Sequence, residues 1–170
     1  MKVWRSKRCG AAVVGAALAF AVTLAQAADA AKPVVKATDI ARGRYLVLVG
    51  GCNDCHTAGF APSAGKVPED QWLLGDGVLG YRGPWGTTYA PNLRRFIGSM
   101  SENQWVNTAK TLKTRPPMPW FTLNDWTSAD LRALYRYIKQ LGPPAEAVTA
   151  FVPPDKTPKP PYIQWPAPPK

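Results

Sequence analysis

The chain has 170 residues, with 21 lysines and arginines against 11 acidic residues and a formal net charge of +10 at pH 7. This length fits one compact domain behind a leader segment. The basic residues form no cluster or motif typical of nucleic-acid binding, so nucleic acid is not an expected partner.

The beginning of the chain has the pattern of an export signal. A basic head is followed by an apolar run over 11–24 and by the small-residue triplet Ala25-Gln26-Ala27. This order predicts a secretory signal peptide over 1–27. The apolar run is shorter than a helix needs to span a bilayer, although an uncleaved anchor is the alternative, and Ala28-Asp29-Ala30 offers a second cleavage site. We therefore expect export to the periplasm and a short N-terminal lead over 28–37.

The first helix of the mature chain is predicted to begin at Thr38 and Asp39, which can cap it, and to end at Gly50-Gly51. The next five residues, Cys52-Asn53-Asp54-Cys55-His56, have the C-x-x-C-H spacing typical of c-type haem attachment. Two thiols three positions apart can share one side of a helical turn and form thioether bonds to the haem vinyl groups, while the adjacent imidazole reaches the iron. We therefore predict one covalently attached haem c, bound through Cys52 and Cys55, with its iron on His56.

Two other interpretations of this motif need partners that the sequence lacks. A redox dithiol is expected beside a βαβ pattern, and a structural zinc site needs a second pair of Cys or His ligands. The third cysteine, Cys9, lies in the predicted signal peptide, and His56 is the only histidine. The mature chain therefore keeps two cysteines, and the haem motif uses both.

A long segment without regular periodicity follows the motif. From Gly59 to Leu93 the chain is rich in Gly and Pro and shows neither a helical nor a strand period, which predicts an ordered loop laid over the haem. Its aromatic residues include Trp72, Tyr81, Trp85 and Tyr89. These side chains can pack on the porphyrin or donate to a propionate, and plain core packing is the alternative for each of them.

Two further helices are predicted after this loop. Ser101-Glu102-Asn103-Gln104 has the spacing of a capping box before a helix that runs to Leu112. Thr127-Ser128-Ala129-Asp130 is similar, and it precedes apolar residues at helical spacing up to Leu141, where Gly142 and two prolines end the helix. No alternating strand pattern stands out, so the sequence predicts an all-α fold, with helices wrapped around one haem and joined by long Gly/Pro loops.

The sixth ligand of the iron must come from a small set of residues. With no second histidine, methionine is the strongest candidate, and Met1 lies in the predicted signal peptide. Met118 lies in a proline-stiffened loop, Arg115 to Trp120, which can present the thioether at little entropic cost. Met100, at the start of the middle helix, has the setting of a packing residue. Met118 is the favoured ligand.

The last segment, 145–170, is predicted to be an extended, proline-rich tail behind a domain over 38–144. Its large apolar residues are Phe151, Tyr162, Ile163 and Trp165. These residues indicate that the tail lies against a surface, either that of its own domain or that of a partner subunit.

Several motifs occur in an order that points to a known family. They are Arg42-Gly43-Arg44-Tyr45-Leu46-Val47, Cys52-Asn53-Asp54-Cys55-His56-Thr57, Ala90-Pro91-Asn92-Leu93, Met118-Pro119 and Asp130-Leu131-Arg132-Ala133-Leu134-Tyr135. In this order they resemble the class I c-type cytochromes, especially the haem modules of membrane dehydrogenase cytochrome subunits that act on alcohols or gluconate. The resemblance implies that His56 and Met118 are the axial ligands and that Gly43 lets the first helix cross the last one closely near Tyr135. Those subunits usually carry three such modules and a membrane anchor, whereas this chain has one module, so their substrate and partner do not transfer.

These expectations describe an electron-transfer protein rather than an enzyme. We expect a periplasmic carrier of single electrons that accepts them from one redox protein and passes them to another. The first alternative is a dedicated cytochrome subunit of a membrane or periplasmic dehydrogenase or oxidase complex. In this alternative the tail holds the chain in place, and the chain is associated with the membrane through its partner. The second is a haem-based ligand sensor or haem enzyme, which needs an open sixth position and against which Met118 argues.

Overall fold

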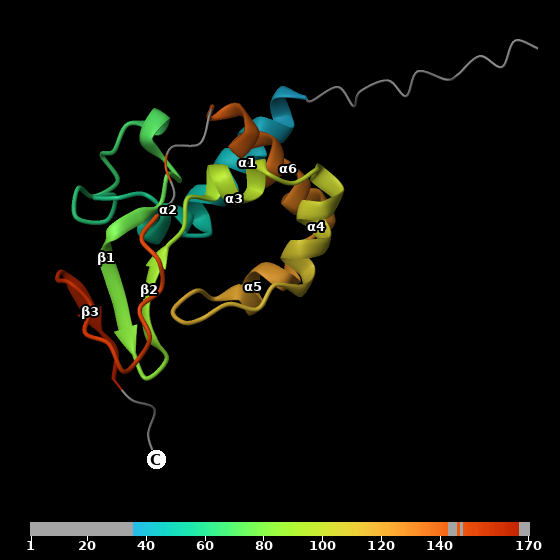
Figure 1. The fold of residues 1–170 in the computed structure, drawn as a ribbon. Coiled ribbons are helices and arrows are strands. Elements are labelled where there is room, and N and C mark those ends of the chain that lie inside the picture. The colour runs from blue at the N-terminus through green and yellow to red at the C-terminus, as the bar shows by residue number, and fades with distance from the viewer. Residues whose placement is uncertain (1–35, 143–145, 147, 167–170) are drawn as a thin grey trace, which may run out of the picture. The chain divides into compact units, whose positions relative to one another are not determined.

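The computed structural model describes residues 36–142, 146 and 148–166, so the predicted signal peptide lies outside the described residues. In chain order the elements are α1 (Ala37–Val49), α2 (Cys52–His56), the 3-10 turn η1 (Glu69–Gln71), β1 (Asp76–Gly83), β2 (Gly86–Ala90), α3 (Leu93–Gly98), α4 (Glu102–Thr111), α5 (Trp120–Asp125), α6 (Ser128–Gln140) and β3 (Tyr162–Gln164). Figure 1 shows the three strands on one side and helices α4, α5 and α6 on the other. None of the described helices is both long and apolar enough to span a bilayer.

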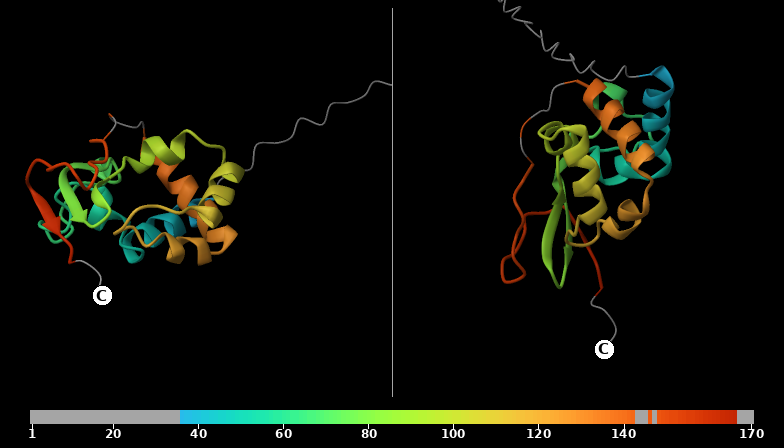
Figure 2. Two further views of the ribbon diagram at one scale, coloured as in Figure 1. Left: turned by 60° about the horizontal axis from the view of Figure 1, so that its bottom comes forward. Right: turned by 90° about the vertical axis from the view of Figure 1, so that its right-hand side faces the viewer.

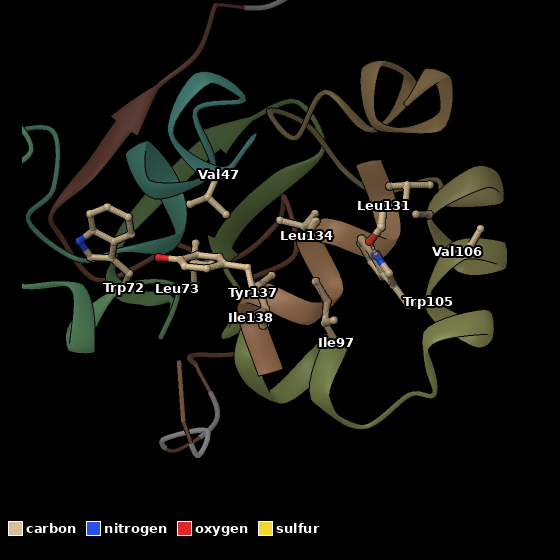
Figure 3. Packing of buried hydrophobic residues seen from close by; sticks show 11 residues of the cluster. Val47, Trp72, Leu73, Ile97, Trp105, Val106, Leu131, Leu134, Tyr137 and Ile138 are labelled. Carbon is tan, nitrogen blue, oxygen red and sulfur yellow. Dashed lines mark hydrogen bonds between the residues drawn. The ribbon is translucent and has the colours of Figure 1, made fainter. Parts of the chain in front are cut away.

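Helix α6 forms the centre of the hydrophobic core. The buried cluster shown in Figure 3 comprises Leu131, Leu134, Tyr137 and Ile138 of α6, Val47 of α1, Ile97 of α3, Trp105 and Val106 of α4, and Trp72 and Leu73 of the loop before β1. Complete burial of one such aliphatic or aromatic side chain stabilises the fold by about 1.5 to 3 kcal/mol. The helical spacing predicted for this face is confirmed at Leu131, Leu134 and Ile138, which are all buried. Tyr137 is also fully buried, although the predicted apolar stripe did not include it.

Helices α1 and α6 cross in direct contact, and Gly43 permits the approach. A Cβ atom at Gly43 would lie 2.2 Å from the backbone oxygen of Ala133 and 2.6 Å from Cβ of Tyr137. The close crossing implied by the family resemblance is therefore present, but its nearest atoms belong to Ala133 and Tyr137 rather than to Tyr135. The Tyr135 hydroxyl instead donates to the backbone oxygen of Met100, at 2.9 Å.

The predicted helix starts are confirmed for α4 and α6 and wrong for α1. Ser101 and Gln104 form the reciprocal capping box of α4, and Thr127 caps α6 by accepting from the backbone N–H of Asp130. Helix α1 begins at Ala37 behind Lys36, without a side-chain cap. Asp39 does not cap it because its carboxylate pairs with Arg136 of α6.

The all-α expectation is wrong, because the described part of the chain contains a three-stranded sheet in the order β2-β1-β3. Strands β1 and β2 form an antiparallel hairpin, and β3 of the tail pairs parallel to β1, with Gly80 opposite Tyr162 and Arg82 opposite Gln164. Three glycines in β1 and an irregularity in the pairing between Asp76 and Tyr81 remove the alternation by which a strand is recognised in a sequence.

Two short helices also lie where the sequence predicted none. Helix α3 begins at Leu93 because the side chain of Asn92 accepts from the backbone N–H of Arg95, at 2.9 Å. Helix α5 follows Pro119 and ends before Trp126. Each has only 6 residues, too few to show a helical period in the sequence.

The proline-rich tail lies on its own domain, which is one of the two predicted alternatives. Beside β2, Val152 exchanges two backbone hydrogen bonds with Thr87, at 2.7 and 3.0 Å. Further along, Pro161 and Trp165 hydrogen-bond to β1, at Gly80 and Arg82. The tail therefore reaches both sides of the hairpin, and it is the red trace beside β1 and β2 in Figure 1 and in both views of Figure 2.

We predict that Gly43→Ala lowers the free energy of unfolding by about 3 kcal/mol, because the added methyl overlaps a backbone oxygen that cannot move without separating two helices. Urea unfolding followed by circular dichroism measures this loss. Gly98→Ala is the matched control, because a Cβ there meets nothing within 4 Å and the change should stay within about 0.5 kcal/mol. Equal effects of the two substitutions would contradict the interpretation of the crossing.

Candidate functional site

The C-x-x-C-H motif forms a short helix of its own. Helix α1 ends at Val49, and Gly51, with a left-handed φ of 65°, turns the chain into α2. Cys52, Cys55 and His56 therefore share one short helix, as their spacing predicted. Both cysteines are unpaired and half-buried, so their thiols are available for a covalent partner.

His56 is buried with its imidazole in a defined orientation. Its Nδ1 atom lies 2.8 Å from the backbone oxygen of Pro91. A carbonyl oxygen only accepts hydrogen bonds, so Nδ1 carries the proton and Nε2 keeps its lone pair. Burial lowers the pKa of His56, and the bond to Pro91 opposes this only in part, so the ring is neutral at pH 7. A neutral imidazole with a free Nε2 is the form that binds a metal ion.

The motif is anchored by hydrogen bonds to the segment that follows it. The Thr57 hydroxyl donates to Oδ1 of Asn53, at 2.7 Å, and accepts from the backbone N–H of Leu73, at 2.8 Å. The backbone N–H of Gly75 donates to the oxygen of His56, at 2.8 Å. The loop between Thr57 and Gly75 thus returns to the C-terminal end of α2 and fixes the position of His56.

These supporting residues were not predicted from the sequence. Asn53 occupies one of the two positions that the motif leaves open, and Thr57 simply follows it. Pro91 belongs to the Ala90-Pro91-Asn92-Leu93 motif of the family resemblance, which gives it no role. Its contact with His56 spans 35 residues of sequence and uses a backbone oxygen, so no residue type marks it in advance.

The thiols do not have the character of a reactive redox pair. Burial raises the pKa of the Cys52 thiol to about 12, so it stays protonated at pH 7. The attacking cysteine of a disulfide oxidoreductase instead has a lowered pKa. Among the described residues there is also no group of three or more His, Cys, Asp or Glu side chains that could hold a metal ion, so a structural zinc site has no ligand set there.

The two candidate methionines differ in their surroundings. The Met100 sulfur accepts a hydrogen bond from the Thr108 hydroxyl, at 3.5 Å, across the turn between α3 and α4. Its backbone is fixed as well, by bonds to Ile97 and Tyr135. The thioether of Met118 has no such partner in the described part of the chain and is half-buried. Of the two methionines, Met118 is therefore the one whose sulfur is available to bind a metal ion.

The four loop aromatics have separate environments. Trp72 packs in the core, with its indole N–H donating to the Val67 oxygen and its ring in an edge-to-face contact with Phe60, so core packing is its role. Tyr81 is buried, and burial together with the neighbouring Cys55 raises its pKa. Tyr89 is buried in β2. The Trp85 indole N–H is buried without a partner in the described residues.

A haem c group fits this set of donors. Two unpaired thiols and an oriented imidazole on one short helix are the groups that covalent attachment and axial ligation require. The buried Nε1 of Trp85 is a hydrogen-bond donor of the kind that a propionate accepts from, and an unpaired buried donor is costly unless something else satisfies it.

Two surface hollows, of about 410 and 620 Å³, flank α3, and none of the four predicted site residues lines either of them.

Comparisons of the chain with protein-family models, with curated proteins and with solved structures gave no match.

We predict that Thr57→Val costs about 2 kcal/mol of unfolding free energy, because valine keeps the shape but leaves the Leu73 N–H and the Asn53 oxygen buried without a partner. Chemical denaturation of the purified protein measures the change. Thr122→Val on α5 is the control, since that side chain is exposed and makes no such bonds. A loss at Thr57 no larger than that at Thr122 would show that the hydroxyl does not anchor the motif.

Proposed function

We propose that this protein is a monohaem c-type cytochrome that carries single electrons between redox proteins. The observation that supports this most strongly is the hydrogen bond from His56 Nδ1 to the Pro91 oxygen, at 2.8 Å. It leaves Nε2 of a buried, neutral imidazole unprotonated, one residue from Cys55 on the same helix. A C-x-x-C-H motif that attaches haem needs this combination, an unprotonated imidazole nitrogen beside the second cysteine.

Each residue of the motif has a separate task in this proposal. Cys52 and Cys55 would hold the haem through thioether bonds, His56 would bind the iron through Nε2, and Met118 would supply the sulfur ligand. When bound, haem c supplies an iron that alternates between the ferric and ferrous states and so holds one electron. The Pro91 oxygen fixes the ring of His56 and increases the basicity of its ligating nitrogen, as partners behind a metal ligand generally do. The bonds of Thr57 and Gly75 keep α2 from moving between the two charge states.

The site favours a carrier over an enzyme. With His56 and Met118 both serving as ligands, the iron would keep no open position for oxygen activation or ligand sensing. A neutral sulfur ligand also stabilises ferrous iron relative to a second imidazole and raises the reduction potential. With the predicted signal peptide, the proposed location is the periplasm, where a redox protein donates the electron and another accepts it.

The alternative of a dedicated subunit in an oxidoreductase complex loses one of its supports. That proposal used the proline-rich tail as the attachment to a partner, whereas Val152, Pro161 and Trp165 hydrogen-bond to the hairpin of their own domain. Copurification from native membranes distinguishes a subunit, which stays with its complex, from a carrier, which does not.

We predict that Met118→Ala, in protein exported with its haem attached, abolishes the weak sulfur-to-iron absorption band of the oxidised form in the near infrared. Removal of the thioether leaves that side of the iron to water or to an added ligand. Met100→Ala is the control and should keep the band, because the Met100 sulfur is bonded to Thr108. Loss of the band with Met100→Ala and its retention with Met118→Ala would overturn the ligand assignment.

A further inference from the structure

The loop that carries Met118 is held weakly by its own hydrogen bonds. It joins α4, which ends at Thr111, to α5, which begins at Trp120. Within the described residues, the hydrogen bonds of residues 114–119 stay local, such as that from the Trp120 N–H to the Met118 oxygen, at 2.9 Å. A ligand loop with so little hydrogen bonding of its own needs an external anchor to keep one position.

The C-terminal tail supplies a contact of this kind. The Arg115 guanidinium lies over the ring of Phe151, with its central carbon 3.8 Å from the ring centroid. Arg115 forms no ion pair with the acidic residues of the described chain, so the aromatic face is the partner of its charge. A cation over an aromatic face stabilises by about 0.5 to 2 kcal/mol, depending on how much water is excluded.

The Phe151 ring is itself fixed to the hairpin. Its neighbour Val152 exchanges two backbone hydrogen bonds with Thr87 of β2, at 2.7 and 3.0 Å. The ring lies against Gly86, where an added Cβ would come within 2.8 Å of the ring atom Cζ. Gly86, with a φ of 103°, therefore leaves the space that the ring occupies. In Figure 1 the loop before α5 extends toward β2, in agreement with this contact.

We propose that Phe151 is a positioning residue for Met118: the tail, fixed on β2, holds the ligand loop through Arg115. Only Pro116 and Pro117 separate Arg115 from Met118, and their rings restrict φ. A fixed Arg115 therefore limits where the thioether of Met118 can lie. This inference rests on the proposed function, because the consequence that matters is how firmly the sulfur stays on the iron.

The first test measures how readily added imidazole displaces Met118 in the haem-loaded protein. The displacement is monitored as the loss of the near-infrared sulfur band. Phe151→Leu keeps an apolar side chain but removes the aromatic face, and it should tighten apparent imidazole binding about fivefold, the upper end of the range for an exposed cation over an aromatic ring. Phe151→Tyr should restore the original affinity. Arg115→Gln should match Phe151→Leu, and the double variant should add nothing further.

Tyr162→Leu is the matched control in the same tail. The Arg82 guanidinium stacks on Tyr162, at 5.9 Å, but both residues belong to the sheet and neither touches the Met118 loop. This variant should leave imidazole binding unchanged. An unchanged affinity in Phe151→Leu, or an equal gain in Tyr162→Leu, would overturn the proposal while leaving the cytochrome assignment in place.

The second test does not depend on the iron. Hydrogen–deuterium exchange at the amides of Trp120 and Thr122, which donate to the oxygens of Met118 and Pro119, should be faster in Phe151→Leu than in the wild type and unchanged in Tyr162→Leu. If the wild-type protein carries no haem, the proposed function fails, and this measurement still decides whether the tail holds the loop. Equal exchange in all three proteins would refute the anchoring role.

Discussion

The hydrogen bond between His56 and the backbone oxygen of Pro91 is the constraint on which the rest of the site depends. It selects the ring nitrogen that carries the proton, and it does so for a side chain that burial keeps neutral. Most of the surrounding structure serves to keep the two groups at this distance. The bonds of Thr57 and Gly75 hold α2 on one side, and the end of β2 holds Pro91 on the other.

The hairpin connects this site to the tail. Strand β2 leads directly to Pro91, and the same strand pairs with Val152, beside Phe151. A segment that looks like a linker in composition therefore contacts two elements that lead to the proposed ligands. It pairs with β2, which runs on to Pro91, and its Phe151 packs on Arg115 in the loop of Met118. Because these contacts are direct, the tail is a structural part of the domain rather than an appendage.

What could be predicted from the sequence was local. The short helix over Cys52–His56, the capping box of α4 and the apolar stripe of α6 each depend on residues a few positions apart, and each is present. The sheet could not be predicted, because β1 is rich in glycine and its partner β3 lies about eighty residues further on, among prolines. The role of Pro91 was hidden for the same reason, since a backbone oxygen has no signature in a sequence.

Mass spectrometry of the protein purified after export tests the central claim most directly. The account predicts the mass of the mature polypeptide plus one covalently attached haem, with neither Cys52 nor Cys55 open to alkylation. A bare polypeptide with two alkylatable thiols, from cells that attach haem to other exported proteins, would contradict it.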